Sequence, residues 1–377
     1  MNILIIEDIA SSSFGGAERS MRAFSERLAM QDHKVHLVYD RFGDYAVEDS
    51  APYASISKIS TLPLRAQSVH NWGKSVWQLS GLCRLHNIDL ILTHVVHSVS
   101  MLRIVRALSR VQIAIYFKWV CGTKSVGRQA TWGLKGFDGG AAVSKFVADY
   151  WIRNGFPAEK MQIVPEGVEC ESLGEKGQSP GGTDLGRENE KPLNVCFAGR
   201  IVKEKGLHVL LDSFAVVSKS VGNINCLIAG AFDSSTSDAS SYRTYVMRKI
   251  EELGLTERVS FVGYIDPLAP FLRNMDVVVI PSLCQDAQPL VLMQSMAEGV
   301  PVLASRVGGI PEVLAGRLEE QMFEPGDAIE LSEKILAIAK APTEQIASLK
   351  QRLRSRVVEN YNLEVSHRRL SAAVGIR

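Results

Sequence analysis

The chain has 377 residues, of which 42 are Lys or Arg and 41 are Asp or Glu, so its formal net charge is +1. This balance argues against a dedicated nucleic-acid binder or a polybasic membrane anchor, because both classes carry a large positive excess. Hydrophobic residues make up 46% and charged residues 22%, as in ordinary globular proteins, which excludes disorder over most of the chain. The length exceeds what one hydrophobic core organises and predicts two domains.

The first part of the chain alternates short apolar runs with segments of helical periodicity. A continuous apolar run such as residues 2–6 is typical of a strand buried on both faces of a parallel sheet. Met21, Phe24 and Leu28 then recur at helical spacing, and the strand–helix–strand order predicts right-handed crossover units. The predicted strands are residues 2–6, 34–39, 90–93, 112–117, 140–143 and 162–164, and the predicted helices are 17–30, 74–86, 98–110 and 144–154.

The composition changes at residues 171–191, which are rich in Gly and charged residues and have little to bury. This stretch predicts a linker between two doubly wound α/β domains. In the second domain the predicted strands are 193–198, 225–229, 259–262, 276–280 and 301–304, and the predicted helices are 206–219, 241–253, 290–298 and 329–339. The predicted domains are 1–170 and 192–355, followed by a helix over 356–377 that crosses back to the first domain.

Cysteine usage and the N-terminus indicate a cytoplasmic protein. Six cysteines are scattered without a C-x-x-C pair or metal-ligand spacing, which favours a reducing compartment. Cys196 and Cys226 lie in apolar runs and are predicted to be buried thiols. The apolar residues 1–6 are followed at once by Glu7 and Asp8, unlike a signal peptide. No apolar stretch approaches the ~20 residues of a membrane-spanning helix.

A pair of cations follows the first strand of the second domain. Arg200 and Lys205 lie between the strand end and Gly206, which opens the next helix. Guanidinium, ammonium and helix N-terminal N–H groups all favour anions, so this loop predicts a phosphate or diphosphate site. Solvated surface cations are the alternative interpretation, and from spacing alone the two are equally supported.

A second loop–helix element, residues 281–297, begins where the strand at 276–280 ends. Pro289 suits the start of a helix, and Asp286 in the loop can accept hydrogen bonds from hydroxyl groups. Gln294 on the helix can both donate and accept. The alternative is that Asp286 caps the helix and Gln294 is an ordinary surface residue. The paired Gly308 and Gly309 allow close approach of the backbone to a ligand but are also common in turns.

His94 ends the strand at 90–93, at the edge of a sheet where α/β proteins bind ligands. A lone histidine is more often structural than catalytic, but the position of His94 beyond a strand end makes the two interpretations equally supported. The chain contains no D-x-D pair to hold a divalent metal on a nucleotide diphosphate, and no G-x-S-x-G of a serine hydrolase.

Taken together in order and spacing, these segments resemble the retaining, GT-B-fold glycosyltransferases of family 4 (glycosyl transferases group 1) along nearly the whole chain. The loop around Gly15 and Gly16 resembles the family's glycine loop, and residues 88–94 are similar to the segment that ends in its active-site histidine. The loop from Gly199 to Gly206 resembles the donor-diphosphate site. Residues 164–169 resemble the family's segment before the linker, with Glu166 and Glu169 where Asn and Asp are more usual.

The resemblance implies an α/β, GT-B fold in which two Rossmann-like domains face each other across a cleft. It also implies a metal-independent hexosyltransferase (EC 2.4 class) that needs no cofactor besides its nucleotide-sugar donor. The implied catalytic residues are His94, Arg200, Lys205 and Asp286. The implied donor-binding residues are Gly15, Gly16, Gly199, Gly263, Tyr264, Leu290, Val291 and Gln294, and no metal ligand is implied.

In one place the chain departs from the family pattern. The family's E-x7-E pair falls on Asp286 and Gln294, so the first carboxylate is shorter and the second is replaced by an amide. Neutral hydrogen bonds are about half as strong as charged ones. These two substitutions therefore predict an active enzyme with an altered preference for its nucleotide-sugar donor. A degenerate, non-catalytic binding subunit is the alternative, and a nucleotide-sugar epimerase on the same architecture is a weaker third hypothesis.

The expected partners are a nucleotide sugar and a glycan, lipid-linked or small-molecule acceptor in cell-surface polysaccharide or glycoconjugate synthesis, and no nucleic acid. Residues 1–170 hold 19 Lys+Arg and 15 Asp+Glu, whereas the remainder holds 23 and 26, so the net charges are +4 and −3. The basic segment 118–135, with Trp119 and Trp132, adds to this excess. These features are compatible with peripheral contact of the N-terminal domain at the inner face of a membrane, and equally with random scatter of surface charge.

Overall fold

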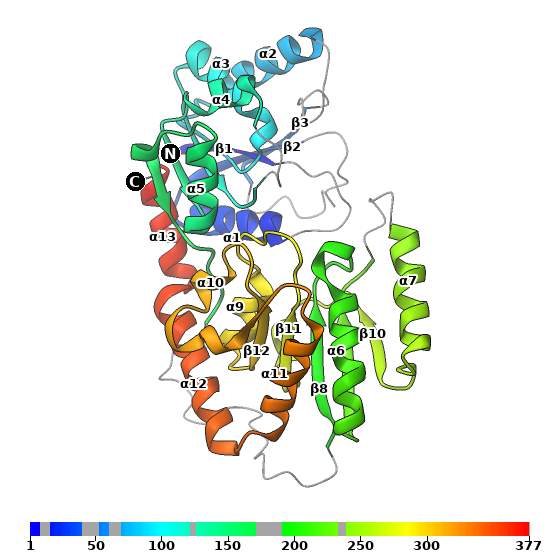
Figure 1. Ribbon diagram of the computed structural model, residues 1–377. Helices are drawn as coiled ribbons and strands as arrows, with labels where there is room; N and C mark the ends of the chain where they lie inside the picture. The colour runs from blue at the N-terminus through cyan, green and yellow to red at the C-terminus, as the bar shows by residue number, and fades with distance from the viewer. Residues whose placement is uncertain are drawn as a thin grey trace. The chain divides into compact units, whose positions relative to one another are not determined.

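The computed structural model describes residues 1–7, 16–39, 53–59, 69–120, 126–170, 191–232 and 239–376. The chain divides into two compact units (Figure 1), one formed by Met1–Glu166 with Glu364–Arg377 and the other by Gly167–Leu363. The predicted linker, apart from Lys191, and the predicted site residue Gly15 lie outside the described residues.

The N-terminal unit contains a seven-stranded sheet in the order β3-β2-β1-β4-β5-β6-β7, with every pair parallel. The chain first adds strands on one side of β1 and then returns to its other side, so β1 and β4 mark a topological switch point. Its strands are β1 (Asn2–Glu7), β2 (Lys34–Tyr39), β3 (Ser55–Lys58), β4 (Leu90–Thr93), β5 (Gln112–Phe117), β6 (Gly139–Ala142) and β7 (Met161–Ile163). Its helices are α1 (Gly16–Met30), α2 (Val69–Leu85), η1 (Val96–Ser98), α3 (Val99–Ser109), α4 (Arg128–Leu134), α5 (Lys145–Arg153), η2 (Ala158–Lys160) and the late α13 (Leu363–Ala373).

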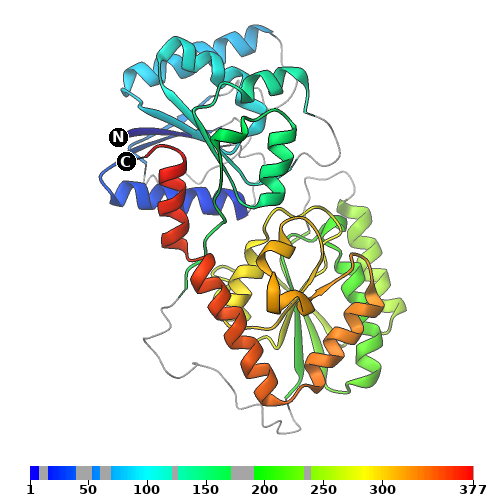
Figure 2. The same cartoon turned by 60° about the vertical axis from the view of Figure 1, so that its left-hand side comes forward.

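The second unit repeats this plan with six parallel strands in the order β10-β9-β8-β11-β12-β13. Figure 2 shows helices on both sides of its sheet. The strands are β8 (Leu193–Ala198), β9 (Ile224–Ala229), β10 (Val259–Gly263), β11 (Val277–Ile280), β12 (Val302–Ser305) and β13 (Met322–Phe323). The helices are η3 (Lys203–Lys205), α6 (Leu207–Ser220), α7 (Ala239–Glu252), α8 (Ala269–Leu272), α9 (Leu290–Ala297), α10 (Ile310–Val313), η4 (Gly316–Gln321), α11 (Ala328–Lys340) and α12 (Thr343–Asn360).

Alternation along each strand of the second sheet builds two cores, one on each face. In β8, Val195 and Phe197 pack with residues of α6 and α11, whereas Cys196 packs with α9 and α12 on the other face. Because helices cover both faces, nearly every position of β8 and β11 is apolar. Cys196 and Cys226 are fully buried, as predicted.

The predicted fold class is confirmed in both units, and β2, β4, β5 and β8 have the predicted bounds. The short strands β3 and β13 and the short helices α4, α8 and α10 were not predicted. The prediction of a single helix over 356–377 is wrong, because the backbone is extended at Asn362, which pairs with Val168. Val168 donates to the carbonyl of Tyr361 and accepts from Leu363, at 2.9 and 3.0 Å, so the chain ends one helix and starts another there.

The last helix, α13, is part of the N-terminal unit, as predicted. Its His367 ring meets Phe24 of α1 edge to face, with ring centroids 5.2 Å apart. Ser366 Oγ donates to the carbonyl of Pro165 at 2.6 Å, and Arg27 of α1 pairs with Glu364 at 3.1 Å. The N-terminal unit is therefore assembled from two separate stretches of sequence.

Candidate functional site

The carboxyl edge of the second sheet carries most of the predicted donor-site residues. β8 and β11 are neighbours in the sheet. After β8 the chain adds β9 and β10 on one side, and after β11 it adds β12 and β13 on the other side. The loops that follow β8 and β11 therefore flank a topological switch point. The β8 loop contains Gly199, Arg200 and Lys205, and the β11 loop contains Asp286. Parallel α/β sheets bind their ligands at this kind of edge.

Two glycines let these loops approach one another closely. Gly206 has φ +71°, and a Cβ at this position would lie 1.9 Å from the carbonyl oxygen of Pro281. Gly308 has φ +57°, and a Cβ there would lie 1.9 Å from the carbonyl oxygen of Asp286. No other residue fits at either position without a backbone shift, so glycine is required to bring the three loops together.

Lys205 and Asp286, 81 residues apart in the chain, form an ion pair between Nζ and Oδ2. Ser282 Oγ donates to the same carboxylate oxygen at 3.1 Å, and the Asp286 side chain is 13% exposed. An ammonium group has three N–H donors, so Lys205 can hold Asp286 and still offer donors to a phosphate oxygen. Arg200, five residues earlier in the same loop, is exposed.

The N-terminus of α9 lies directly after the Asp286 loop. Pro289 caps it, and its carbonyl accepts from Leu292 at 3.1 Å. The N–H groups of Leu290 and Val291 are in the first turn, where an α-helix has no internal acceptors for them. They therefore form, with Arg200 and Lys205, a set of donors suited to a diphosphate. Gln294 is half-buried one turn further along α9.

Gly263 ends β10, the edge strand of this sheet, and Tyr264 directly follows it. β9 separates β10 from β8, so Gly263 lies about 10 Å from the end of β8. The carbonyl of Gly263 accepts from Gly230 at 2.7 Å, and the Tyr264 side chain is exposed. The structure therefore places these two residues at the same sheet edge as the cationic loop but further along it.

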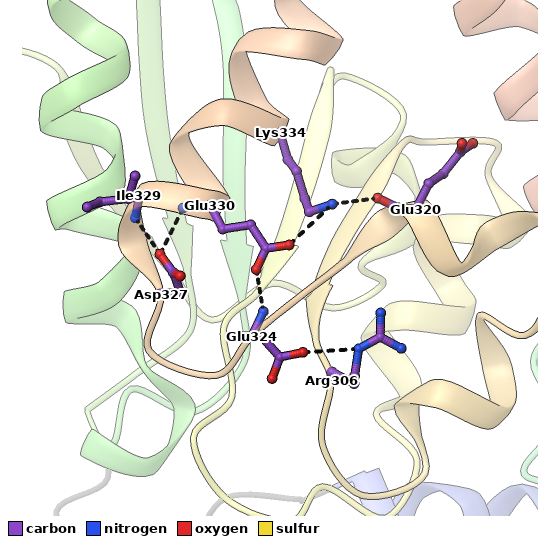
Figure 3. A network of polar contacts seen from close by, with 7 residues as sticks. All are labelled: Arg306, Glu320, Glu324, Asp327, Ile329, Glu330 and Lys334. Carbon is purple, nitrogen blue, oxygen red and sulfur yellow. Dashed lines mark hydrogen bonds and ion pairs between the residues drawn. The ribbon is translucent and has the colours of Figure 1, made fainter.

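A network of polar contacts links Arg306, directly after β12, to the start of α11 (Figure 3). Arg306 pairs with Glu324 at 3.2 Å, and the backbone N–H of Glu324 donates to Glu330 at 2.7 Å. Lys334 lies 3.5 Å from Glu330 on α11. Asp327 caps that helix by accepting from the backbone N–H groups of Ile329 and Glu330 at 3.0 and 2.9 Å. These contacts connect the residue that precedes the Gly308 loop to the segment that begins α11.

In the N-terminal unit, His94 follows β4 and is buried. Neither ring nitrogen has a hydrogen-bond partner among the described residues. Burial, with a smaller contribution from the charge of Lys118, lowers the pKa of His94 to about 3. The imidazole is therefore neutral at physiological pH and can act as an uncharged donor or acceptor.

A buried polar triad lies at the end of β5, beside this histidine. Lys118 pairs with Glu166 at 2.8 Å and donates to Ser20 Oγ at 2.6 Å, while Ser20 donates to the other oxygen of Glu166. The side chains of Lys118 and Glu166 are 2% and 7% exposed. Ser20 is one turn into α1, so the triad fixes the first turn of the helix that Gly16 begins. This triad was not predicted from the sequence as part of a site. Lys118 directly follows β5, as His94 directly follows β4, and this position after a strand is the signal from which the triad could have been found.

The predicted site residues therefore fall into two groups. Gly199, Arg200, Lys205, Asp286, Leu290, Val291 and Gln294 gather at one sheet edge of the second unit, with Gly263 and Tyr264 further along it. His94 and Gly16 belong to the N-terminal unit. Within the described ranges, no group of three or more His, Cys, Asp and Glu side chains could hold a metal ion, and no helix is long and apolar enough to cross a membrane.

Both units match family models. Residues 14–172 match the model described as Glycosyltransferase Family 4, and residues 192–341 match the model described as Glycosyl transferases group 1. The chain is 24% identical over 227 residues to the amylovoran biosynthesis glycosyltransferase AmsK of Erwinia amylovora, which is 58% of this chain and 52% of that protein. It is 29% identical over 212 residues to a lipopolysaccharide 1,2-N-acetylglucosaminetransferase of Salmonella typhimurium, covering 55% and 54%. The chain thus spans about half the length of the curated relatives it matches.

Solved structures share the fold over the whole chain. A glycosyltransferase from Rickettsia africae superposes with a TM-score of 0.83 at 18% identity, covering 100% of this chain and 98% of that one. HepE of Anabaena, in complex with UDP and glucose, superposes with a TM-score of 0.80 at 16% identity, covering 99% of both chains.

Proposed function

Because the chain belongs to the GT-B-fold glycosyltransferases of family 4, we propose that it is a retaining hexosyltransferase that uses a nucleotide-diphosphate sugar. The acceptor would be a glycan, a lipid-linked sugar or a small molecule in polysaccharide or glycoconjugate synthesis. The single observation that carries this proposal is the donor set at the carboxyl edge of the second sheet. There, Arg200 and Lys205 lie in the loop next to the first turn of α9.

In the proposed reaction, the bond between the anomeric carbon and the diphosphate oxygen breaks and a bond to the acceptor oxygen forms. The proton of the acceptor hydroxyl passes to the departing diphosphate. Arg200, Lys205 and the N–H groups of Leu290 and Val291 would stabilise the negative charge that develops on this leaving group. No step requires a metal ion, so a chelator such as EDTA should leave the rate unchanged.

The remaining residues would orient the donor. Gln294 would hydrogen-bond the ribose, and Asp286, held by Lys205 and Ser282, would accept from sugar hydroxyls. The neutral imidazole of His94 would offer a hydrogen bond to the transferred sugar without adding charge. Tyr264 would lie beside the nucleotide base.

A panel of nucleotide sugars tests this proposal, with UDP-glucose first because HepE has also been solved in complex with UDP-glucose. Released nucleoside diphosphate is the readout, with and without candidate acceptors. Arg200→Ala should lower kcat at least about a hundredfold, the usual cost of removing one transition-state donor. Lys203→Ala, in the same loop, is the matched control and should retain activity. Release that needs no acceptor and regenerates a nucleotide sugar would instead indicate an epimerase.

A non-catalytic binding subunit is the second candidate, favoured by the mutual neutralisation of Lys205 and Asp286 and by the uncharged Gln294. Gln294→Glu separates the two candidates. In an active enzyme the restored carboxylate should lower the donor KM several-fold, since charged hydrogen bonds are about twice as strong as neutral ones. Tight nucleotide binding without turnover, in both the wild type and this variant, would favour the binding subunit.

A further inference from the structure

Three helices of the N-terminal unit, α2, α3 and α4, contain no Asp or Glu. Every other α-helix described in this unit, namely α1, α5 and α13, contains at least one. Between residues 69 and 135 the sequence has nine Lys or Arg and a single acid, Asp89, so this stretch has a formal charge of +8. The rest of residues 1–170 must then be net negative, since the total there is +4. Five of these nine cations lie in α2, α3 and α4, whereas Lys118 is buried in its ion pair with Glu166. The three helices therefore contain five cations and no acid.

These helices form one layer. α2 packs against α3 and α3 packs against α4, and Figure 1 shows the three grouped on one side of the unit's sheet. α2, α3 and α4 precede β4, β5 and β6, and these strands extend the sheet in one direction. Because the crossover connections are right-handed, the three helices lie on the same face of the sheet. Their outward sides consequently form one continuous surface, which we call the α2–α4 face.

The α2–α4 face also exposes large apolar side chains. Trp77 and Leu85 of α2 are each 72% exposed, Leu108 of α3 is 60% exposed and Trp132 of α4 is 44% exposed. These four are more than half of the exposed large apolar residues described in the N-terminal unit, the others being Met1, Met30 and Ile163. Apolar side chains exposed within a cationic surface are characteristic of interfaces rather than of free surface.

Cations and apolar residues are interleaved along α2. Four residues of α2 are exposed on one side of the helix, namely Lys74, Trp77, Arg84 and Leu85. Trp77 lies three residues after Lys74, Arg84 lies seven after Trp77, and Leu85 lies eleven after Lys74. Each of these intervals brings an α-helix back to nearly the same direction. The opposite side, with Val76 and other apolar residues, is buried. The stripe therefore combines charge and apolar surface on the side that faces away from the core.

Acidic side chains neutralise only part of this surface. Asp138 is bonded to Arg106 of α3 at 2.8 Å, and Asp149 of α5 pairs with Lys145 of its own helix. No ion pair to an acidic side chain is present among the described residues for Lys74, Arg84, Arg110, Arg128 or Lys135. The Arg103 guanidinium lies over the ring of Trp132, 4.3 Å from the ring centroid. This contact joins α3 to α4 and adds another cation to the face.

We propose that the α2–α4 face docks onto the surface of a membrane that contains anionic phospholipids. Lys and Arg beside a bilayer are attracted by its negative surface potential, each strengthening binding by about fivefold. Exposed Trp and Leu can enter the headgroup region, where an amphipathic ring is favoured. A soluble polyanion would use the cations but would leave Trp77, Leu85 and Leu108 in water, so it explains only half of the surface. This inference does not depend on the proposed function, since it concerns a different unit and a different ligand.

Vesicle co-sedimentation tests the docking surface on the full chain. Vesicles of phosphatidylcholine alone and of phosphatidylcholine with phosphatidylglycerol are compared at low and high salt. We expect binding only to the mixed vesicles, weakened by salt because exposed charges are screened. Lys74→Glu with Arg84→Glu should weaken this binding by about tenfold or more. Trp77→Ser alone should also weaken it, by removing apolar insertion at constant charge.

Arg317→Glu with Lys340→Glu is the matched control. Both residues are exposed in the second unit, and the change in net charge is the same. This control should bind like the wild type. The proposal is overturned if the mixed vesicles are not bound at low salt, or if the two double variants weaken binding equally. It is also overturned if heparin is bound while the vesicles are not, which would assign the surface to a soluble polyanion.

Discussion

At the scale of single residues, the ion pair between Lys205 and Asp286 was not predicted. The sequence indicated both as site residues but gave them separate roles, a phosphate ligand and a hydroxyl acceptor. Their contact depends on β8 and β11 being neighbours and on Gly206 lying against Pro281, and both follow from the packing of loops 81 residues apart. Residue type and strand ends could be predicted from the sequence, whereas the pairing of side chains between loops could not.

Two buried histidines predict how stability depends on pH. Burial lowers the pKa of His94 to about 3 and that of His367 to about 4, with cations nearby adding to both effects. The unfolded chain, with histidine pKa values near 6.5, then binds these protons before the folded chain does. The stability they contribute is full above pH 6.5 and is lost as the pH falls towards 4. Between pH 7 and pH 5 we expect each histidine to cost about 2 kcal/mol of unfolding free energy.

Urea unfolding at a series of pH values measures this effect. His94→Gln should remove about 2 kcal/mol of the stability loss between pH 7 and pH 5, and His367→Gln should remove a similar amount. If either variant is too unstable to study, the histidine resonances of the wild type can be followed by NMR instead. Titration of both rings near pH 6.5 in the folded protein would contradict the expectation.

At the scale of elements, strands buried on both faces were predicted more accurately than anything else. β2, β4, β5 and β8 are mostly apolar, with His36 inside β2 and Asn194 inside β8, and such runs have clear ends. β3 was missed because three of its four residues are polar, and β13 because two residues are too few to show a period. Their strand conformation comes from pairing with β2 and β12 and is therefore a tertiary effect.

Gly206→Ala should be strongly destabilising. The new Cβ would lie 1.9 Å from the carbonyl oxygen of Pro281, and the left-handed backbone adds its own strain, so we expect a loss of about 3 kcal/mol or more. Gly254→Ala is the matched control, since its φ is +66° and nothing lies within 4 Å of its Cβ position. That variant should lose only about 1–2 kcal/mol. Equal losses in thermal or urea unfolding would show that loop contact contributes nothing at Gly206.

The buried pair of Lys118 and Glu166 makes a different prediction for α1 and β5. Lys118→Met leaves the Glu166 carboxylate buried without its cation and should cost about 3–5 kcal/mol of unfolding free energy. Glu166→Gln should cost a similar amount by stranding the ammonium. The double variant should be more stable than the sum of the single losses predicts, because neither charge is then left alone. Strict additivity in this cycle would mean that the pair does not couple the two elements.

At the scale of the whole molecule, the N-terminal unit is discontinuous in sequence. Residues 364–377 contain nearly all of α13, which contacts Phe24 of α1 through His367. They also supply the buried residues Leu370, Val374 and Ile376. Deleting this stretch should expose α1, and hydrogen exchange should show lost protection in α1 and β1. Protection in β8 and α6 of the second unit should change little, because their contacts lie within 167–363.

Arg27→Ala serves as the control for this deletion. It removes only the exposed ion pair to Glu364, which is worth less than about 1 kcal/mol, and leaves the apolar contacts of α13 in place. Exchange in α1 should then match the wild type. Loss of protection throughout both units after the deletion would mean that the two units unfold as one.

The position of α13 also determines the order in which the protein can be completed on the ribosome. The 197 residues from Gly167 to Leu363 are synthesised between the two parts of the N-terminal unit. At the usual rate of elongation this interval is roughly 10–40 s. During that time the nascent first unit has all seven strands but lacks the helix that covers α1, whereas the second unit is continuous and can close as soon as it emerges. The unit whose synthesis begins first is therefore the last to be finished, and its apolar α1 surface is available to chaperones until then.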